Sequence, residues 1–190
     1  MKKLMTGIVL CFHFFVSTVA AQIVNGSFEL NGQPSLEGWQ NYGGQLRHEA
    51  PPGGGEWSLE ISGGCEWGWV YQPLPQIKNN EIWRLSCWAR RTSSLGGGEI
   101  AWFLPGSRQS LKSVFIPDTL WTQASLVDTF SLSETDTVTV LLQGGGGVAG
   151  WGGAYFDLVE VEKLGVISSV MNEVSEFPKV FALYQNYPNP

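Results

Sequence analysis

Aromatic side chains are the residues of this chain whose type and spacing could do chemistry. Trp67, Trp69 and Tyr71 alternate along one short run, with Val70 between them, so their rings point to one side of an extended strand. Trp88 projects from the polar side of another extended run. A flat indole or phenol ring can stack on the apolar face of a sugar ring, while polar side chains at the rim bond to the sugar hydroxyls. These four aromatic residues are therefore the main candidates for a ligand-binding surface.

Two more tryptophans and three polar residues complete the candidate set. Trp102 either contacts a ligand or belongs to the core, and Trp151 stands in a glycine-rich loop, where a large exposed ring is unusual without a function. Exposed arginines often serve only solubility, but planar polar side chains could also supply rim hydrogen bonds. The polar candidates are Arg84, Arg90 and Gln143.

The elements that must hold these side chains are short strands. The chain has 24 Gly and 10 Pro, its apolar runs alternate or are β-branched, and no window has a convincing helical period. This pattern predicts an all-β fold, a two-sheet jelly-roll β-sandwich. The expected strands are 23–29, 36–42, 58–61, 68–72, 81–91, 99–104, 112–116, 121–130, 137–143 and 155–163.

Alternation within 81–91 and 137–143 divides core residues from surface residues. In the first window Trp83, Leu85 and Cys87 share one side, and the side that carries Trp88 is otherwise polar. Four tryptophans in core-like positions are expected to be structural: Trp39, Trp57, Trp83 and Trp121. Cys65 and Cys87 either form a disulfide or are both buried and unpaired.

Catalysis has little support in this sequence. His48 is the one histidine after residue 21, and no nucleophile-elbow spacing is present. Glu60, Glu66 and Glu99 could in principle approach one another as hydrolase carboxylates, but no pair can be placed across a cleft. The chain is therefore expected not to be an enzyme.

Charge and the first residues restrict partners and location. There are 17 Asp+Glu against 11 Lys+Arg, with no basic stripe, which argues against a nucleic-acid partner. Residues 1–21 have the pattern of a signal peptide, with Lys2 and Lys3, an apolar stretch Leu4–Phe15 and small residues before Gln22. That stretch is shorter than the ~20 apolar residues of a membrane-spanning helix. We expect export of a mature chain that has no membrane span.

The order of several motifs is similar to a known family. The motifs are Ile23–Glu29, Gly38-Trp39, Trp57–Ile61, Tyr71–Leu74, Ile82–Arg90, Leu120–Thr122, Thr137–Val140 and Tyr155–Val159. Together they resemble the galactose-binding-like jelly-roll carbohydrate-binding modules that accompany xylanases and glucanases. The resemblance covers residues 22–163. It implies a structural Ca²⁺ ion, with Glu29 and Asp157 matching the family's acidic ligands and main-chain carbonyls near 56–58 completing the shell.

A second resemblance lies at the other end of the chain. Phe181–Pro190 is similar to the opening of a type IX secretion C-terminal sorting domain, so residues 177–190 are expected to be its truncated start and 164–176 a linker. The sequence as a whole predicts a secreted or cell-surface, non-catalytic module that binds a plant-type or similar polysaccharide or oligosaccharide and is exported by the type IX secretion machinery. The alternatives are an adhesion or structural sandwich without a sugar ligand and, less favoured, a small glycoside hydrolase.

Overall fold

The protein is a two-layer β-sandwich. A computed structural model describes residues 22–63, 67–145 and 152–167, and all regular elements in these ranges are strands. The predicted all-β sandwich is thereby confirmed. The strands are β1 Glu29–Leu30, β2 Gln33–Pro34, β3 Gln40–Tyr42, β4 Gly44–Arg47, β5 Ser58–Gly63, β6 Gly68–Leu74, β7 Glu81–Arg91, β8 Gly98–Leu104, β9 Gln109–Phe115, β10 Thr122–Thr129, β11 Val138–Gly144 and β12 Gly152–Val166.

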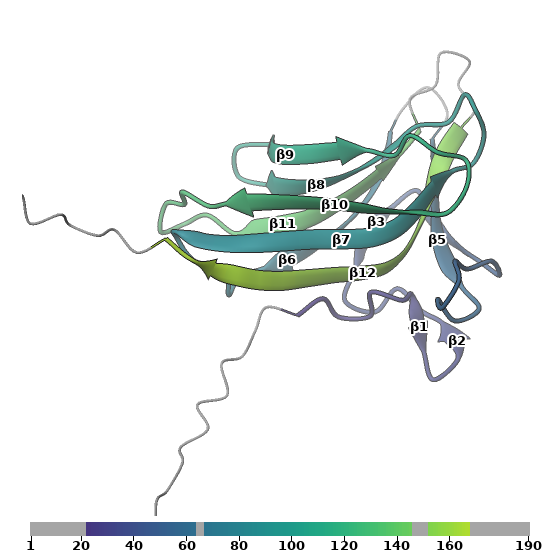
Figure 1. The fold of residues 1–190 in the computed structure, drawn as a ribbon, viewed down its shortest axis with the longest axis horizontal. Coiled ribbons are helices and arrows are strands. Elements are labelled where there is room, and N and C mark those ends of the chain that lie inside the picture. Colours follow the sequence, from purple (N-terminus) through teal and green to yellow (C-terminus); the bar gives the residue numbers. More distant parts are fainter. Residues whose placement is uncertain (1–21, 64–66, 146–151, 168–190) are drawn as a thin grey trace, which may run out of the picture.

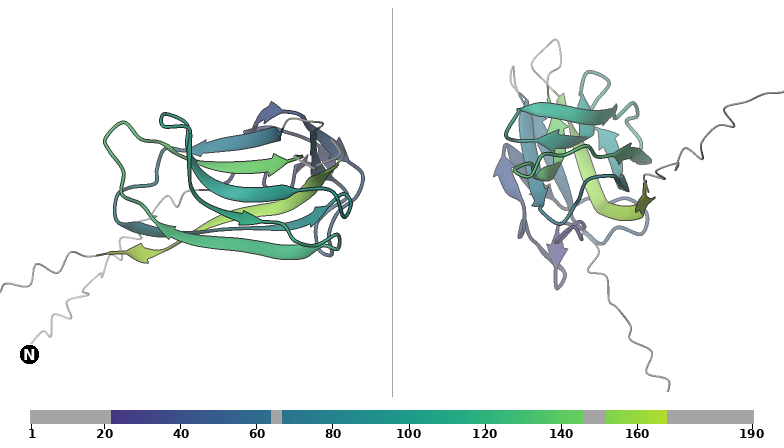
Figure 2. Two further views of the ribbon diagram at one scale, coloured as in Figure 1. Left: turned by 90° about the horizontal axis from the view of Figure 1, so that it is seen from above. Right: turned by 90° about the vertical axis from the view of Figure 1, so that its left-hand side faces the viewer.

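Two five-stranded antiparallel sheets form the layers. The first sheet has the strand order β3-β6-β11-β8-β9, and the second has β10-β7-β12-β5-β4. In Figure 1 the long strands β7, β10 and β12 of the second sheet run in front of β6, β8 and β11, and Figure 2 gives the same stack from two other sides. The small β1–β2 hairpin lies at one end, near β5 (Figure 1).

The core lies between the inner faces of the two sheets. The inward residues of β7 are buried as the alternation predicts, whereas Ser86 and Trp88 are half-buried on the outer side. Trp83 and Trp102 are fully buried, and the Trp102 ring meets Phe130 edge to face with centroids 5.2 Å apart. Such a pair adds about 0.5–1.5 kcal/mol beyond the apolar area that it buries.

Glu81 is a buried carboxylate at the start of β7 with a full set of partners. It forms an ion pair with Lys163, and its Oε2 accepts hydrogen bonds from Lys78 N (2.9 Å) and Trp83 Nε1 (3.0 Å). Burial alone raises the pKa of Glu81, but the hydrogen bonds from Lys163, Lys78 and Trp83 together outweigh it, so the pKa is below its ordinary value. This cluster fastens the last part of β12 to β7.

Several expected strand bounds differ from the observed ones; the expected strand 36–42, for example, is a strand only over Gln40–Tyr42. The segment 23–29 is mostly a turn and not a strand, because Asn25 and Phe28 adopt left-handed backbone angles (φ 54° and 56°) and Phe28 N donates to Asn25 O. The strand expected at 155–163 extends further on both sides, since β12 covers Gly152–Val166.

Several sequence predictions lie outside the described residues. They are the signal peptide at 1–21, the sorting-domain start at 177–190, Trp151, and Cys65 as a disulfide partner. Cys87 is buried in the core. No helix in the described part of the chain is long and apolar enough to cross a membrane.

Candidate functional site

A row of side chains crosses the outer face of the first sheet at right angles to its strands. The pairing register places Tyr42 opposite Trp69, Trp69 opposite Gln143, Gln143 opposite Glu99, and Glu99 opposite Phe115. Directly opposed residues of antiparallel strands point to the same face, with Cβ atoms about 4.5–5.5 Å apart. The row therefore has aromatic rings at both ends, on the edge strands β3 and β9, with an amide and a carboxylate near its middle.

The aromatic rings of this row are available to a ligand. The exposed fractions of Tyr42, Trp69 and Phe115 are 61%, 40% and 52%, which is high for rings of this size. Tyr42 and Trp69 form a tilted pair with centroids 5.8 Å apart. Two stacking surfaces thus lie side by side at the β3 edge of the row.

A groove of about 540 Å³ runs beside the row on the same face. Its lining adds Tyr71, whose hydroxyl donates to Gln40 Oε1 at 2.6 Å, together with Phe103, Leu141 and Arg108. Because Tyr71 lies directly opposite Gln40 and Leu141 in the register, these side chains form a second row parallel to the first. The groove thus joins aromatic faces to an amide and a guanidinium.

Trp67 lies just before β6 and does not line the groove. It is 38% exposed, and a Cβ added at Gly97 would lie 3.5 Å from both Trp67 Cη2 and Phe115 Cε2. The Trp67 and Phe115 rings thus both border Gly97. The three predicted aromatic residues Trp67, Trp69 and Tyr71 are all at least partly accessible, and Val70 is buried on the opposite side, as expected.

Three members of the row were not assigned to binding from the sequence: the aromatic residues Tyr42 and Phe115 and the carboxylate Glu99. Glu99 is the ionisable group near the middle of the row. Burial raises the pKa of its carboxyl group, and the hydroxyl of Ser113 partly offsets that effect. Its position beside Gln143 comes from the pairing of β8 with β11, strands that are separated by β9 and β10 in the sequence. Alternation within one strand gives no signal for such a pair.

The other predicted ligand residues are not on this face. Trp88, Arg84 and Arg90 belong to β7 in the second sheet, so they cannot share one ligand with Trp69. The expectation of a single site that contains all of these residues is wrong. Trp102 is completely buried in the core and offers no stacking surface.

Arg90 is already engaged by its own protein. Its guanidinium carbon lies 4.1 Å from the Tyr155 ring centroid and 5.5 Å from that of Trp121, and its Nη2 contacts Glu49 Oε1 at 2.5 Å. Trp121 is consequently half-buried on the outer side of the second sheet and not in the core where it was expected. Trp57 is also only half-buried, because it packs edge to face against exposed His48 with centroids 5.1 Å apart.

The two predicted calcium ligands lie close together under a glycine-containing loop. A Cβ added at Gly54 would collide with Asp157 Oδ2, and one at Gly55 would collide with the Glu29 carboxylate. Asp157 is fully buried, and its Oδ2 has no hydrogen-bond partner among the described residues. Burial raises the pKa of Asp157 to about 7, with the Leu158 N–H lowering it and the Glu29 charge adding to the rise.

This pair fits a hard cation only with help from other oxygen atoms. The described residues contain no group of three or more His, Cys, Asp or Glu side chains that could hold a metal. Glu29 Oε1 also accepts hydrogen bonds from the main-chain N–H groups of Glu56 and Trp57. Ca²⁺ also takes main-chain carbonyl and water oxygens beside carboxylates, so two carboxylates and a surrounding loop are compatible with it.

One of the carboxylate pairs considered for a hydrolase, Glu60 with Glu99, is excluded by the fold. Glu60 is on β5 of the second sheet, where it pairs with Arg47, while Glu99 is on the first sheet. Glu66 lies outside the described residues. The two described acids therefore cannot flank one glycosidic bond.

Comparisons with known proteins identify the fold. No protein-family model matches the chain, and no curated protein sequence is significantly similar. Among solved structures, "Family 16 Carbohydrate Binding Module-2" aligns over 74% of this chain and 98% of its own, with 20% identity and a TM-score of 0.53. The CBM22-1 xylan-binding domain of Xyn10C from Paenibacillus barcinonensis aligns over 72% and 92%, with 13% identity and a TM-score of 0.52.

An enzyme has the same architecture. A cyclase from Fischerella sp. TAU, in complex with 4-(1H-indol-3-yl)butan-2-one, aligns over 78% of this chain and 100% of its own, with 13% identity and a TM-score of 0.59. At these identities the likeness establishes a shared jelly-roll fold, which confirms the predicted architecture. Function has to be argued from the site, because one fold supports many functions.

Proposed function

We propose that this chain is a non-catalytic carbohydrate-binding module that holds a polysaccharide across the outer face of its first sheet. The observation that carries the proposal is the row Tyr42, Trp69, Gln143, Glu99 and Phe115. Exposed rings at its two ends can stack on apolar sugar faces, and the amide and carboxylate between them can bond to hydroxyl groups. The jelly-roll likeness to carbohydrate-binding modules supports the same class of ligand.

The size of the row indicates an extended ligand. Its ends lie on strands separated by four interstrand spacings of ~4.8 Å, so the row spans about 19 Å. This length exceeds a single sugar ring several times over. A plant-type or similar polysaccharide that lies across the strands is therefore the ligand that we propose.

We further propose that Ca²⁺ supports the fold beside Asp157 and Glu29. When bound, the ion would supply positive charge to two neighbouring carboxylates, one of which is buried without a full set of partners. The residues that would hold it are Asp157, Glu29 and main-chain oxygens of the surrounding loop. Its role is structural, because the pair lies away from the first sheet, on and beside β12 of the second.

Export is part of the proposal and is supported by the sequence alone. The pattern of residues 1–21 favours cleavage before Gln22, and Phe181–Pro190 favours recognition by the type IX secretion machinery. The protein would then act in the medium or at the cell surface. N-terminal sequencing of material recovered from outside the cell should begin at Gln22, and an intact Met1 there would contradict export by cleavage.

Retention in native gels that contain polysaccharide tests the binding function. Xylan, β-glucan and galactomannan are cast in separate gels, and we expect at least one to slow the full chain. Gln143→Leu keeps the volume of the side chain but removes its amide, so the retained band should move faster. Leu120→Ala is the control, because Leu120 is 76% exposed and lies outside both rows.

The outcomes separate the candidate functions. If no polysaccharide retards the chain, the adhesion or structural module without a sugar ligand is the better description. Reducing-sugar release by the purified chain, lost with Glu99→Gln, would instead revive a hydrolase. Equal retention of Gln143→Leu and the unsubstituted chain would contradict the proposal that the polysaccharide binds to the first sheet.

A further inference from the structure

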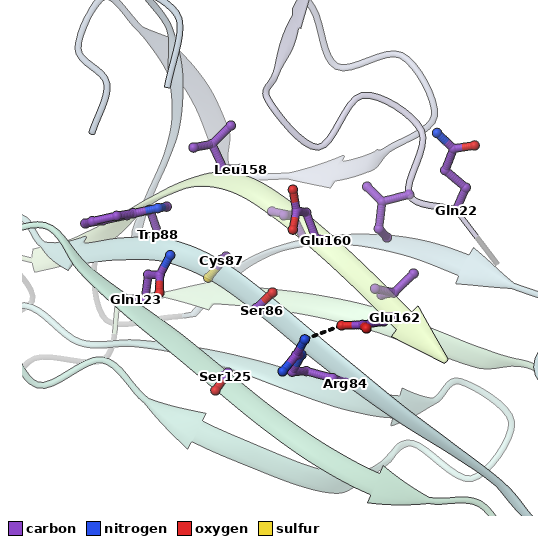
Figure 3. A pocket seen from close by; sticks show the side chains of 13 residues that line it. Gln22, Arg84, Ser86, Cys87, Trp88, Gln123, Ser125, Leu158, Glu160 and Glu162 are labelled. Carbon is purple, nitrogen blue, oxygen red and sulfur yellow. Dashed lines mark hydrogen bonds and ion pairs between the residues drawn. The ribbon is translucent and has the colours of Figure 1, made fainter. Parts of the chain in front are cut away.

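A second hollow lies on the opposite side of the sandwich, on the outer face of the second sheet. Its volume is about 670 Å³, and side chains of β7, β10 and β12 line it together with Gln22 and Ile23 (Figure 3). It shares no residue with the groove of the first sheet. The predicted ligand residues Trp88 and Arg84, which the first-sheet site does not use, both belong to it.

The pairing register explains why the sheet is hollowed here. Ser86 on β7 lies opposite Ser125 on β10 and Glu160 on β12, so two of the three positions across the middle have short side chains. Along β7, Trp88 lies on one side of this row, and Arg84, joined to Glu162, lies on the other side (Figure 3). Four residue steps of ~3.3 Å separate Trp88 from Arg84 along β7, so the floor is roughly 13 Å long.

A bulge in β12 helps to form one wall. Asp157 pairs with Trp88 and Glu160 with Ser86, so β12 contains one extra residue between these positions. Leu158 in the bulge has a left-handed backbone (φ 49°), and the bulge directs Leu158 toward the hollow, which it lines.

The N-terminal segment closes the remaining side and is held in place. Gln22 and Ile23 line the hollow, and the next residue, Val24, is fixed by both of its main-chain groups. Val24 N donates to Gln72 Oε1 at 2.7 Å, and Gln72 Nε2 donates to Val24 O at 3.0 Å. Two hydrogen bonds to Gln72 on β6 therefore hold this wall in a fixed position.

The lining has the chemistry of a saccharide site. Trp88 is a half-buried ring among polar side chains, with the amide of Gln123 directly across from it on β10. Ser86 and Ser125 can each donate and accept a hydrogen bond, as sugar hydroxyls require of their partners. An indole at one end of a polar floor offers a stacking surface and hydroxyl partners in one place.

The charges of the lining narrow the ligand class. Arg84 is neutralised by its ion pair with Glu162, which leaves the carboxylate of Glu160 facing the hollow without a cation among the lining side chains. An acidic sugar would be repelled by this excess of negative charge. We infer that the second sheet carries a separate binding site for a short neutral saccharide, centred on Trp88, Ser86 and Ser125. This inference does not rest on binding at the first sheet.

The test follows the indole Nε1–H NMR signals of the full chain with Trp69→Ala, in which first-sheet binding is weakened. Cellotriose, xylotriose and laminaritriose are the probes, and Trp88→Phe assigns the Trp88 signal. We expect a saturable shift of that signal with at least one neutral probe and none with trigalacturonate. Adding Ser125→Arg, which fills the hollow from an exposed position on β10, should abolish the shift.

Three results would overturn the inference. They are a Trp88 signal that no neutral probe moves, a shift that persists unchanged with Ser125→Arg, and a stronger response to trigalacturonate than to the neutral probes. In the chain without substitutions, titration should give two saccharides per protein, and Ser125→Arg should give one. Failure of the first-sheet proposal is detected separately, in the chain without substitutions, as the absence of any shift of the Trp69 signal.

Discussion

Replacing Trp69 by alanine should weaken polysaccharide binding by roughly 30- to 150-fold, equivalent to about 2–3 kcal/mol. Trp69 is 40% exposed. For a side chain of ~250 Å² that fraction is about 100 Å², of which a ligand on one face covers about half. At ~25–30 cal/mol per Å², the lost apolar contact is worth about 1.3–1.5 kcal/mol. The lost ring stacking contributes about 0.5–1.5 kcal/mol more.

Isothermal titration with a soluble hexasaccharide of the polymer that retards the chain in gels measures this loss. Leu120→Ala is the matched control and should bind as the unsubstituted chain does. Far-UV circular dichroism should be the same for both variants, since Trp69 points out of the sandwich. A loss smaller than about threefold, with the fold intact, would refute the reasoning, because the ring would then contribute little beyond ordinary surface contact.

Three other predictions concern stability. Trp102→Ala should lower the free energy of unfolding by about 3–5 kcal/mol, measured by urea denaturation, because it leaves a cavity against Phe130. A chelator should lower the melting temperature of the native chain but not that of Asp157→Asn; equal shifts in both would argue against a calcium site there. Folding lowers the pKa of Glu81 below its ordinary value of 4.5. The stability that the ionised Glu81 carboxylate contributes is therefore fully present above pH 4.5 and is lost as the pH falls through the pKa of the folded state. Stability measured from pH 7 to pH 3 should therefore fall less in Glu81→Gln, which starts about 1–3 kcal/mol lower; parallel curves would contradict this.

The sequence predicts strands best where one face is buried and the other is polar. The window 81–91 is observed as β7 with the same bounds, because its alternation leaves a single way to bury Leu85 and Cys87. The segment 23–29 fails, since its apolar residues belong to a turn that is set by left-handed Asn25 and Phe28, and hydrophobicity does not report backbone angles.

The assembly of the site is the part that single-strand patterns cannot supply. Alternation correctly identified Trp69 and Trp88 as outward-facing, yet it gives no information on which sheet a strand joins, and the two residues are on opposite faces of the molecule. Glu99 was missed for the related reason that its partner Gln143 is fixed by long-range register. Arg90 looked like a free rim residue because neither Tyr155 nor Glu49 is near it in the sequence.

The row on the first sheet begins on one edge strand, β3, and ends on the other, β9. A polymer lying along it would enter over one margin of the molecule and leave over the other. Recognition would then depend on interior sugar units of the polysaccharide and would not require its reducing or non-reducing end. Shortening a long glycan should reduce the number of protein molecules that it carries well before it reduces the affinity of each one.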